Sequence, residues 1–161
     1  TAPIAGQNFG AGHGDRVRET FWAGVRISTG IMLASTVVCQ VAAAPMVAFF
    51  NADPAVVGFG AEYLRIVSWS FAASGVIFVA SSLFQGMGNT MPALASSAMR
   101  LVTFALPLYW LAHRPGFFVR QIWYLSVATI VVHLSASLWL LRREFARKLD
   151  VAPPVVIAPG T

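Results

Sequence analysis

The sequence has 161 residues, 57% hydrophobic and only 11% charged, with a formal net charge of +5 and a mean hydropathy of +0.70. A soluble domain is about one quarter charged, and a chain of this length cannot hide so much apolar surface in one core, so the composition excludes a soluble protein and predicts an all-α integral membrane protein. The basic residues lie at the ends of apolar segments, where they set membrane orientation, so no nucleic-acid partner is predicted.

Four apolar stretches follow one another along the chain. The predicted transmembrane helices cover residues 23–50, 63–84, 91–112 and 118–141. Each reaches the ~20 residues that a helix needs to cross ~30 Å of hydrocarbon. Residues 1–22 are predicted to be a cytoplasmic loop and residues 142–161 a cytoplasmic C-terminal tail. Short turns join the stretches, so neighbouring helices are expected to be antiparallel.

The first apolar stretch carries a polar face as well as a lone cysteine. Gln40, with Thr36 and Ser35 nearby, is a candidate for lining a cavity. Cys39 lies in an apolar run, and a single cysteine predicts neither a disulfide nor a metal site. Before this stretch the chain begins at Thr1 with no signal peptide and no initiator Met. We therefore expect it to be part of a longer protein or a processed form.

The second apolar stretch carries serines at Ser70, Ser74 and Ser81. Ser74 is a second candidate for lining a cavity. Packing between helices accounts for serines in a membrane span equally well. A glycine-rich turn at residues 85–90 then leads into the third stretch.

Arg100 lies about nine residues into the third apolar stretch, which corresponds to ~14 Å along a helix axis. An arginine at membrane depth indicates function by default, because burying its charge in lipid is costly. The alternative is that Arg100 snorkels to the inner headgroups while the small residues around it pack against other helices.

His133 is the candidate in the fourth apolar stretch, on one helical face with Ser126, Thr129 and Ser137. An imidazole titrates near neutral pH and is suited to proton exchange. The alternative is a neutral side chain that is hydrogen-bonded to a neighbouring helix.

The charges in the loops orient the predicted helices. Basic residues on the proposed inner face are Arg16, Arg18, Arg142, Arg143, Arg147 and Lys148, whereas the opposite loops carry only Arg114. The positive-inside rule therefore predicts a multi-pass protein of the inner (plasma) membrane with both termini in the cytoplasm.

No catalytic pattern emerges from the sequence. Gly10, Gly12 and Gly14 do not form a dinucleotide fingerprint, because no strand precedes them. The histidines share no helix face with an acidic residue, and paired carboxylates are absent from the apolar stretches. We predict that the protein is not an enzyme and that it uses no cofactor and no metal site.

Two predicted inner-face loops are rich in glycine and amide side chains, one beginning at Gly6-Gln7-Asn8 and the other at Gln85-Gly86. Both resemble loops of MATE (multidrug and toxic compound extrusion) transporters. The first resembles the loop before the third helix of a lobe and contains Gly6, Gln7, Asn8, Gly10 and Gly12. The second resembles the inner-face turn two helices later and contains Gln85, Gly86, Gly88, Asn89 and Pro92. Together with the spans between them, the resemblance extends from Ala2 to about Lys148.

The resemblance implies the last four helices of a twelve-helix antiporter, that is, part of a six-helix C-terminal lobe. Such proteins expel cationic, amphipathic compounds in exchange for Na⁺ or H⁺. The implied partners are membrane lipid, a small-molecule substrate, the coupling ion and the remaining transporter helices. The second apolar stretch has no acidic residue between Leu64 and Phe84, so no coupling residue is transferred from the family.

Two alternatives to the antiporter stay open. One is a lipid-linked saccharide flippase of the same superfold, whose more basic cavity would suit Arg100. The other is a small four-helix membrane subunit that does not transport.

Overall fold

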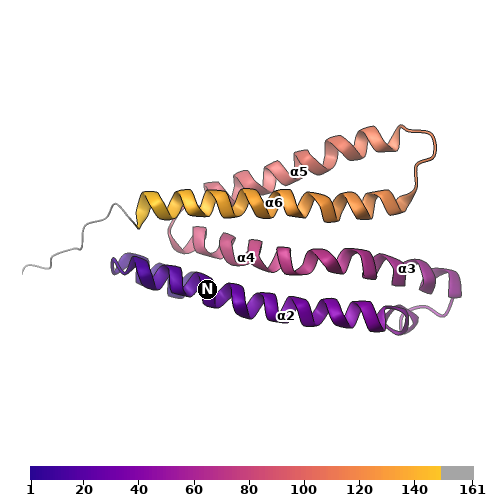
Figure 1. The fold of residues 1–161 in the computed structure, drawn as a ribbon, viewed down its shortest axis with the longest axis horizontal. Helices are drawn as coiled ribbons and strands as arrows, with labels where there is room; N and C mark the ends of the chain where they lie inside the picture. Colours follow the sequence, from indigo (N-terminus) through magenta and orange to yellow (C-terminus); the bar gives the residue numbers. More distant parts are fainter. Residues whose placement is uncertain (150–161) are drawn as a thin grey trace, which may run out of the picture.

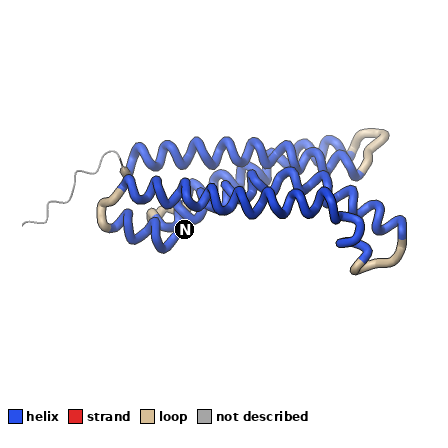
Figure 2. The backbone as a smooth tube through the Cα atoms, turned by 60° about the horizontal axis from the view of Figure 1, so that its bottom comes forward, coloured by secondary structure: helices blue, strands red, loops and turns tan. Residues whose placement is uncertain are grey.

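The computed structural model describes residues 1–149, and these residues form helices joined by short loops. The helices are α1 (Ala2–Gly10), α2 (Gly14–Ala48), α3 (Pro54–Val67), the 3₁₀ turn η1 (Ser68–Ser70), α4 (Phe71–Gly86), α5 (Met91–Ala112) and α6 (Val119–Lys148). The long helices lie side by side (Figure 1), and the loops that join them lie at the two ends of the bundle (Figure 2). The prediction of an all-α fold is confirmed.

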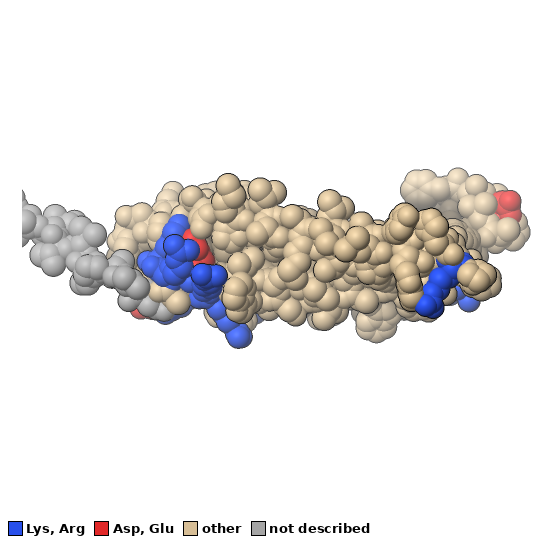
Figure 3. All heavy atoms as spheres, turned by 90° about the horizontal axis from the view of Figure 1, so that it is seen from above, with Lys and Arg blue, Asp and Glu red and all other residues tan. Residues whose placement is uncertain are grey.

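Four helical segments are long and apolar enough to cross a membrane: Gly14–Ala48, Pro54–Gly86, Met91–Ala112 and Val119–Lys148. The second of these combines α3, η1 and α4. On the face shown in Figure 3, the charged side chains gather near the two ends and leave an uncharged middle. This distribution is the one expected of helices whose middle lies in hydrocarbon.

The helices extend beyond their predicted limits at three places. Residues 1–22, predicted as a loop, contain α1 and the first turns of α2, while α3 begins at Pro54 rather than at residue 63. The predicted tail begins inside α6, which continues to Lys148, and its remainder after residue 149 lies outside the described residues. The apolar pattern marks only the part of a helix that meets hydrocarbon, whereas backbone hydrogen bonding continues past it into the polar layer.

Side chains are packed most tightly at the end of the bundle where α1 lies. The buried cluster there consists of Ala5, Val17, Phe21, Val79, Ala80, Leu83, Phe84, Met87 and Leu141. These residues come from α1, α2, α4 and α6 and from the turn after α4. The short helix α1 therefore packs against both α2 and α4 at this end of the bundle.

Two glycines allow α1 to lie against the end of α4. A Cβ atom added to Gly6 would meet the carbonyl oxygen of Gly86 at 3.1 Å. A Cβ atom added to Gly86 would meet the carbonyl oxygen of Ala2 at 2.7 Å, closer than real side chains approach. Only residues without a side chain permit this contact between two backbones. The two loop motifs identified in the sequence therefore touch each other.

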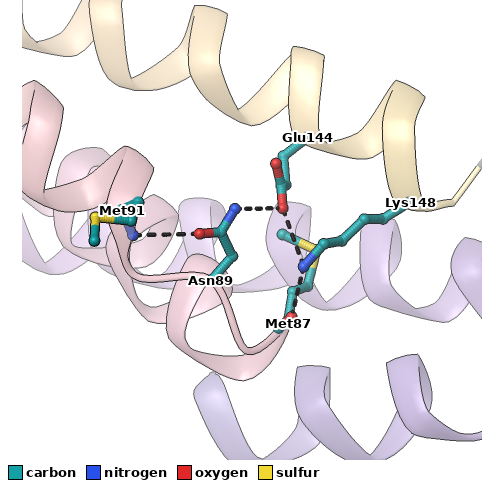
Figure 4. Close-up of polar contacts among 5 residues, drawn as sticks. All are labelled: Met87, Asn89, Met91, Glu144 and Lys148. Atoms are coloured by element: carbon teal, nitrogen blue, oxygen red, sulfur yellow. Dashed lines mark hydrogen bonds and ion pairs between the residues drawn. The ribbon is translucent and has the colours of Figure 1, made fainter.

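A polar clamp fastens the turn between α4 and α5 to the end of α6 (Figure 4). Asn89 donates from Nδ2 to Oε1 of Glu144 at 2.8 Å, and Lys148 lies 3.1 Å from the same oxygen. Lys148 also donates to the carbonyl oxygen of Met87 at 2.9 Å. Glu144 is only 3% exposed, so its carboxylate depends on these two donors in place of water.

The contact between α1 and α4 predicts that a single methyl group at Gly86 is destabilising. Gly86→Ala forces the two backbones apart and should cost about 1–3 kcal/mol, which is typical of overpacking. Thermal unfolding of the detergent-solubilised protein measures the effect. Gly30→Ala is the matched control, because nothing lies within 4 Å of a Cβ atom placed there. Equal melting temperatures for the two variants would contradict the packing of α1.

The clamp predicts that Glu144→Ala lowers the stability of the protein by about 1–3 kcal/mol, because it leaves the amide of Asn89 without an acceptor. Glu144→Gln retains an acceptor oxygen and should lose less. The exposed Glu19, replaced by Gln, serves as the control for loss of a carboxylate. Unfolding in increasing SDS compares the three variants, and a Glu144→Ala variant as stable as Glu19→Gln would refute the clamp.

Candidate functional site

Arg100 and His133, which the sequence singles out in separate helices, line one hollow between α5 and α6. The hollow has a volume of about 330 Å³ and is lined by Ser97, Arg100, Leu101, Phe104, Ser126 and His133. The α5 residues follow the i, i+3, i+4, i+7 spacing of one helix face. This face of α5, which carries Ser97 and Arg100, therefore faces α6 at this level.

His133 is the most deeply buried ionisable group in this hollow, with 5% of its surface exposed. Within residues 1–149, neither of its ring nitrogens has a hydrogen-bond partner, and the hydroxyl of Ser137 one turn later also has none. The interhelical hydrogen bond considered for His133 is therefore not made by the described residues. Buried polar atoms without partners are rare in folded proteins, which makes His133 a candidate for binding a group outside the described residues.

A second polar group surrounds the break between α3 and α4. The turn η1 interrupts the regular helix, and such a break leaves carbonyl groups that need new donors. Gln40 donates from Nε2 to the carbonyl oxygen of Arg65 at 2.7 Å and to Oγ of Ser68 at 2.9 Å. Thr36 donates to the carbonyl oxygen of Ser68 at 2.9 Å. The polar face of α2 thus stabilises an interruption in the neighbouring span.

Gln40 and Ser74 therefore lie away from the hollow that contains Arg100 and His133. Gln40 borders a different hollow, of about 280 Å³, together with Arg65, Trp69 and Tyr124. Ser74 is half-buried and donates to the carbonyl oxygen of Ser70 at 2.9 Å, so its hydroxyl bonds to its own helix beside the break.

A third hollow lies near the loop between α5 and α6. It has a volume of about 700 Å³ and is lined by Phe59, Glu62, Phe118, Val119, Arg120, Gln121 and Tyr124. Nε of Arg120 lies 2.6 Å from Oε1 of Glu62. The ion pair therefore joins α6 to α3. The lining thus combines aromatic rings with one carboxylate, which is paired with the guanidinium of Arg120.

The remaining motif residues shape the loops at the α1 end. Gly12 and Gly88 adopt φ angles of +74° and +71°, which favour glycine, and Pro92 lies in the first turn of α5. Asn8 donates to the carbonyl oxygen of Ile4, within α1. Gln7, Gly10 and Gln85 are exposed. The side chain of Asn89, by contrast, reaches another helix, where it donates to Glu144.

The sequence did not indicate the contacts of Ser68, Glu62 and Glu144, and it indicated Lys148 only as a charge that orients the helices. Glu62 and Arg120 are far apart in the sequence, and only their proximity to the ends of two predicted spans hinted at a contact. Within the described residues, no group of three or more His, Cys, Asp or Glu side chains is placed to hold a metal ion.

Comparison with known proteins connects this architecture to a family. The family model MatE matches residues 1–111, which extend from α1 to the end of α5 and make up more than half of the 161 residues. Searches of curated proteins and of solved structures find no match. The matched residues include both glycine-containing loop motifs and three of the four membrane-length segments. This chain therefore belongs to the MatE family of membrane efflux transporters.

Proposed function

We propose that this chain belongs to the C-terminal lobe of a cation-coupled antiporter that exports cationic, amphipathic compounds in exchange for Na⁺ or H⁺. The family match over residues 1–111 carries the proposal. The four membrane-length segments with polar groups between them support it, since a transporter binds its substrate among such helices.

The hollow beside Glu62 supports the cationic class of substrate. Phe59, Phe118 and Tyr124 offer aromatic faces, and Glu62 offers the carboxylate that an organic cation needs at low dielectric. Arg120 occupies that carboxylate in the present structure. A cationic substrate would displace Arg120 from Glu62 when it binds, and the return of Arg120 to Glu62 would release the substrate.

The interrupted span supports a moving transporter. A helix that is broken at η1 bends there at lower cost than a continuous helix, and discontinuous spans are a recurring feature of transporters. Gln40 and Thr36 add side-chain donors to the carbonyl groups of Arg65 and Ser68, which also accept from Oγ of Ser68 and from the backbone N–H of Phe71, so the break exposes no unpaired carbonyl group at these two residues.

A second candidate function is the flipping of a lipid-linked saccharide. The specific observation in its favour is the basic character of the hollow that contains Arg100, which no carboxylate lines. Such a substrate carries phosphate groups, which an arginine binds well.

Export of ethidium, a cationic amphipathic dye, tests the leading proposal. Cells that lack other efflux pumps and express the complete gene product should accumulate less dye than cells with empty vector. The Na⁺ gradient and the H⁺ gradient are then collapsed in separate experiments. Dye accumulation should be restored only when the gradient of the coupling ion is lost, which identifies that ion. Accumulation equal to that of the vector control, with the protein present in the membrane, would contradict drug export and favour the flippase.

Glu62→Gln should reduce the initial rate of ethidium export at least about threefold, because it removes the carboxylate from the aromatic hollow. Glu19→Gln, at an exposed position in α2, is the matched control and should export normally. Dye fluorescence at equal expression compares the three proteins. Equal rates of ethidium export by the two variants would show that Glu62 does not bind the substrate.

Gln40→Leu keeps most of the side-chain volume but removes both hydrogen bonds that Gln40 donates to the broken span. We expect a loss of about 1 kcal/mol in unfolding free energy, as for other hydrogen bonds between membrane helices. Ser35→Ala is the control, because the Ser35 hydroxyl bonds to Ile31 in its own helix. SDS-induced unfolding measures both, and equal stability would show that the break does not depend on Gln40.

A further inference from the structure

The hollow between α5 and α6 carries a positive charge that the described residues do not balance. Arg100 lies on its wall, about 14 Å along α5 from Met91. An unpaired guanidinium at that depth costs several kcal/mol unless an opposite charge or water compensates it.

The acidic side chains among residues 1–149 all lie elsewhere. Glu62 pairs with Arg120, Glu144 pairs with Lys148, and Asp15 lies 3.8 Å from Arg18. Asp53 caps the start of α3, and Glu19 borders a hollow with Arg16 near α1. None of the five lines the hollow with Arg100. Within the described residues, the charge of Arg100 therefore has no partner.

The buried imidazole of His133 gives an independent indication of a ligand. It is 95% buried (5% exposed), it lines the same hollow, and both of its nitrogens lack a partner within residues 1–149. A neutral imidazole always presents one N–H donor, and that donor has no acceptor here. An arginine from α5 and an unsatisfied histidine from α6, both lining one hollow, call for an acceptor that carries negative charge.

We propose that the hollow between α5 and α6 binds the anionic head, a phosphate or a carboxylate, of an amphipathic molecule. The guanidinium of Arg100 matches two oxygens of such a group through its planar fork, and His133 donates a further hydrogen bond. Ser97 and Ser126 add hydroxyl groups, while Leu101 and Phe104 provide an apolar wall for the rest of the molecule. The volume of about 330 Å³ is that of a small-ligand site.

This site goes beyond the proposed cation export and does not depend on it. The hollow proposed for cations is lined by Glu62 and three aromatic rings, and it shares no lining residue with the hollow of Arg100. Export of ethidium and binding of an anion are therefore measured separately, and the failure of one leaves the other standing.

Binding of octyl phosphate tests the proposal. The complete gene product is placed in phosphatidylcholine nanodiscs, and calorimetry measures binding after subtraction of empty nanodiscs. We expect saturable binding to the unmodified protein, weakened about 10- to 100-fold by Arg100→Gln, since a charged hydrogen-bonding partner is lost. His133→Phe, which removes both ring nitrogens, should weaken it about three- to tenfold.

Arg26→Gln is the matched control, because it removes one positive charge from an exposed site on α2. It should bind octyl phosphate with the affinity of the unmodified protein. Octyltrimethylammonium, the cationic counterpart of the probe, should lose no affinity in Arg100→Gln. If Arg100→Gln does not fold, Arg100→Lys decides the matter: a single ammonium lacks the fork and should bind about three- to tenfold more weakly.

The lipid composition of the nanodiscs identifies the source of the anion. A lipid headgroup in the hollow predicts that added phosphatidylglycerol competes with octyl phosphate and that mass spectrometry finds this lipid retained by the unmodified protein but not by Arg100→Gln. A solute from water predicts the same octyl phosphate affinity in both kinds of nanodisc. Either result supports the site. Equal affinity of Arg100→Gln, Arg26→Gln and the unmodified protein would overturn it and assign Arg100 to the headgroup region.

Discussion

Hydrocarbon offers no hydrogen-bond partners, and this constraint determines how the described helices fit together. Long helices meet it by internal backbone bonding, but the second span does not remain regular: η1 interrupts it between α3 and α4. That interruption is tolerable because α2 places Gln40 and Thr36 opposite it, where their side chains donate to the carbonyl groups of Arg65 and Ser68. The contact between α2 and the second span thus buries side chains and also supplies hydrogen-bond donors to backbone carbonyl groups at the break.

The end of the bundle that carries α1 meets a different requirement, because chain segments there leave the membrane and must still be held in place. The helix α1 is nine residues long, too short to be stable alone in water. It persists because Gly6 and Gly86 let two backbones touch and because Ala5 enters the buried cluster. The clamp between Glu144 and the turn at Asn89 then ties α6 to the same region. The two loop motifs and the C-terminal part of α6 therefore form one structural unit.

Much of this was predictable from the sequence, for identifiable reasons. The third span has the predicted limits, Met91–Ala112, because a glycine-rich turn precedes it and His113, Arg114 and Pro115 follow. Arg100 was identified as a candidate from its depth in that span alone.

What the sequence did not reveal depends on contacts made by distant segments. No proline or glycine lies within Ser68–Ser70, so nothing local indicated a break there. Glu144 lies in a run of charged residues that is typical of a solvated helix end, and it is buried only because the α4–α5 turn folds over it. The helix α1 likewise owes its existence to α4 and not to an apolar pattern of its own.

Two regions of the described structure differ in whether their polar groups have hydrogen-bond partners: the region around η1 and the hollow between α5 and α6. The helix α4 buries six of its residues against its neighbours, whereas α5 buries only Ser96. Where α2, α3 and α4 meet, the break in the backbone is closed by side chains of the chain itself. Between α5 and α6, by contrast, Arg100 and His133 present a charge and unpaired nitrogens to a hollow. A charged or unpaired polar group inside a membrane protein costs free energy. A ligand of opposite charge offsets that cost when it binds, so such groups are typical of binding sites. The proposed anion site therefore lies between α5 and α6, whereas the polar groups around η1 already have partners within the chain.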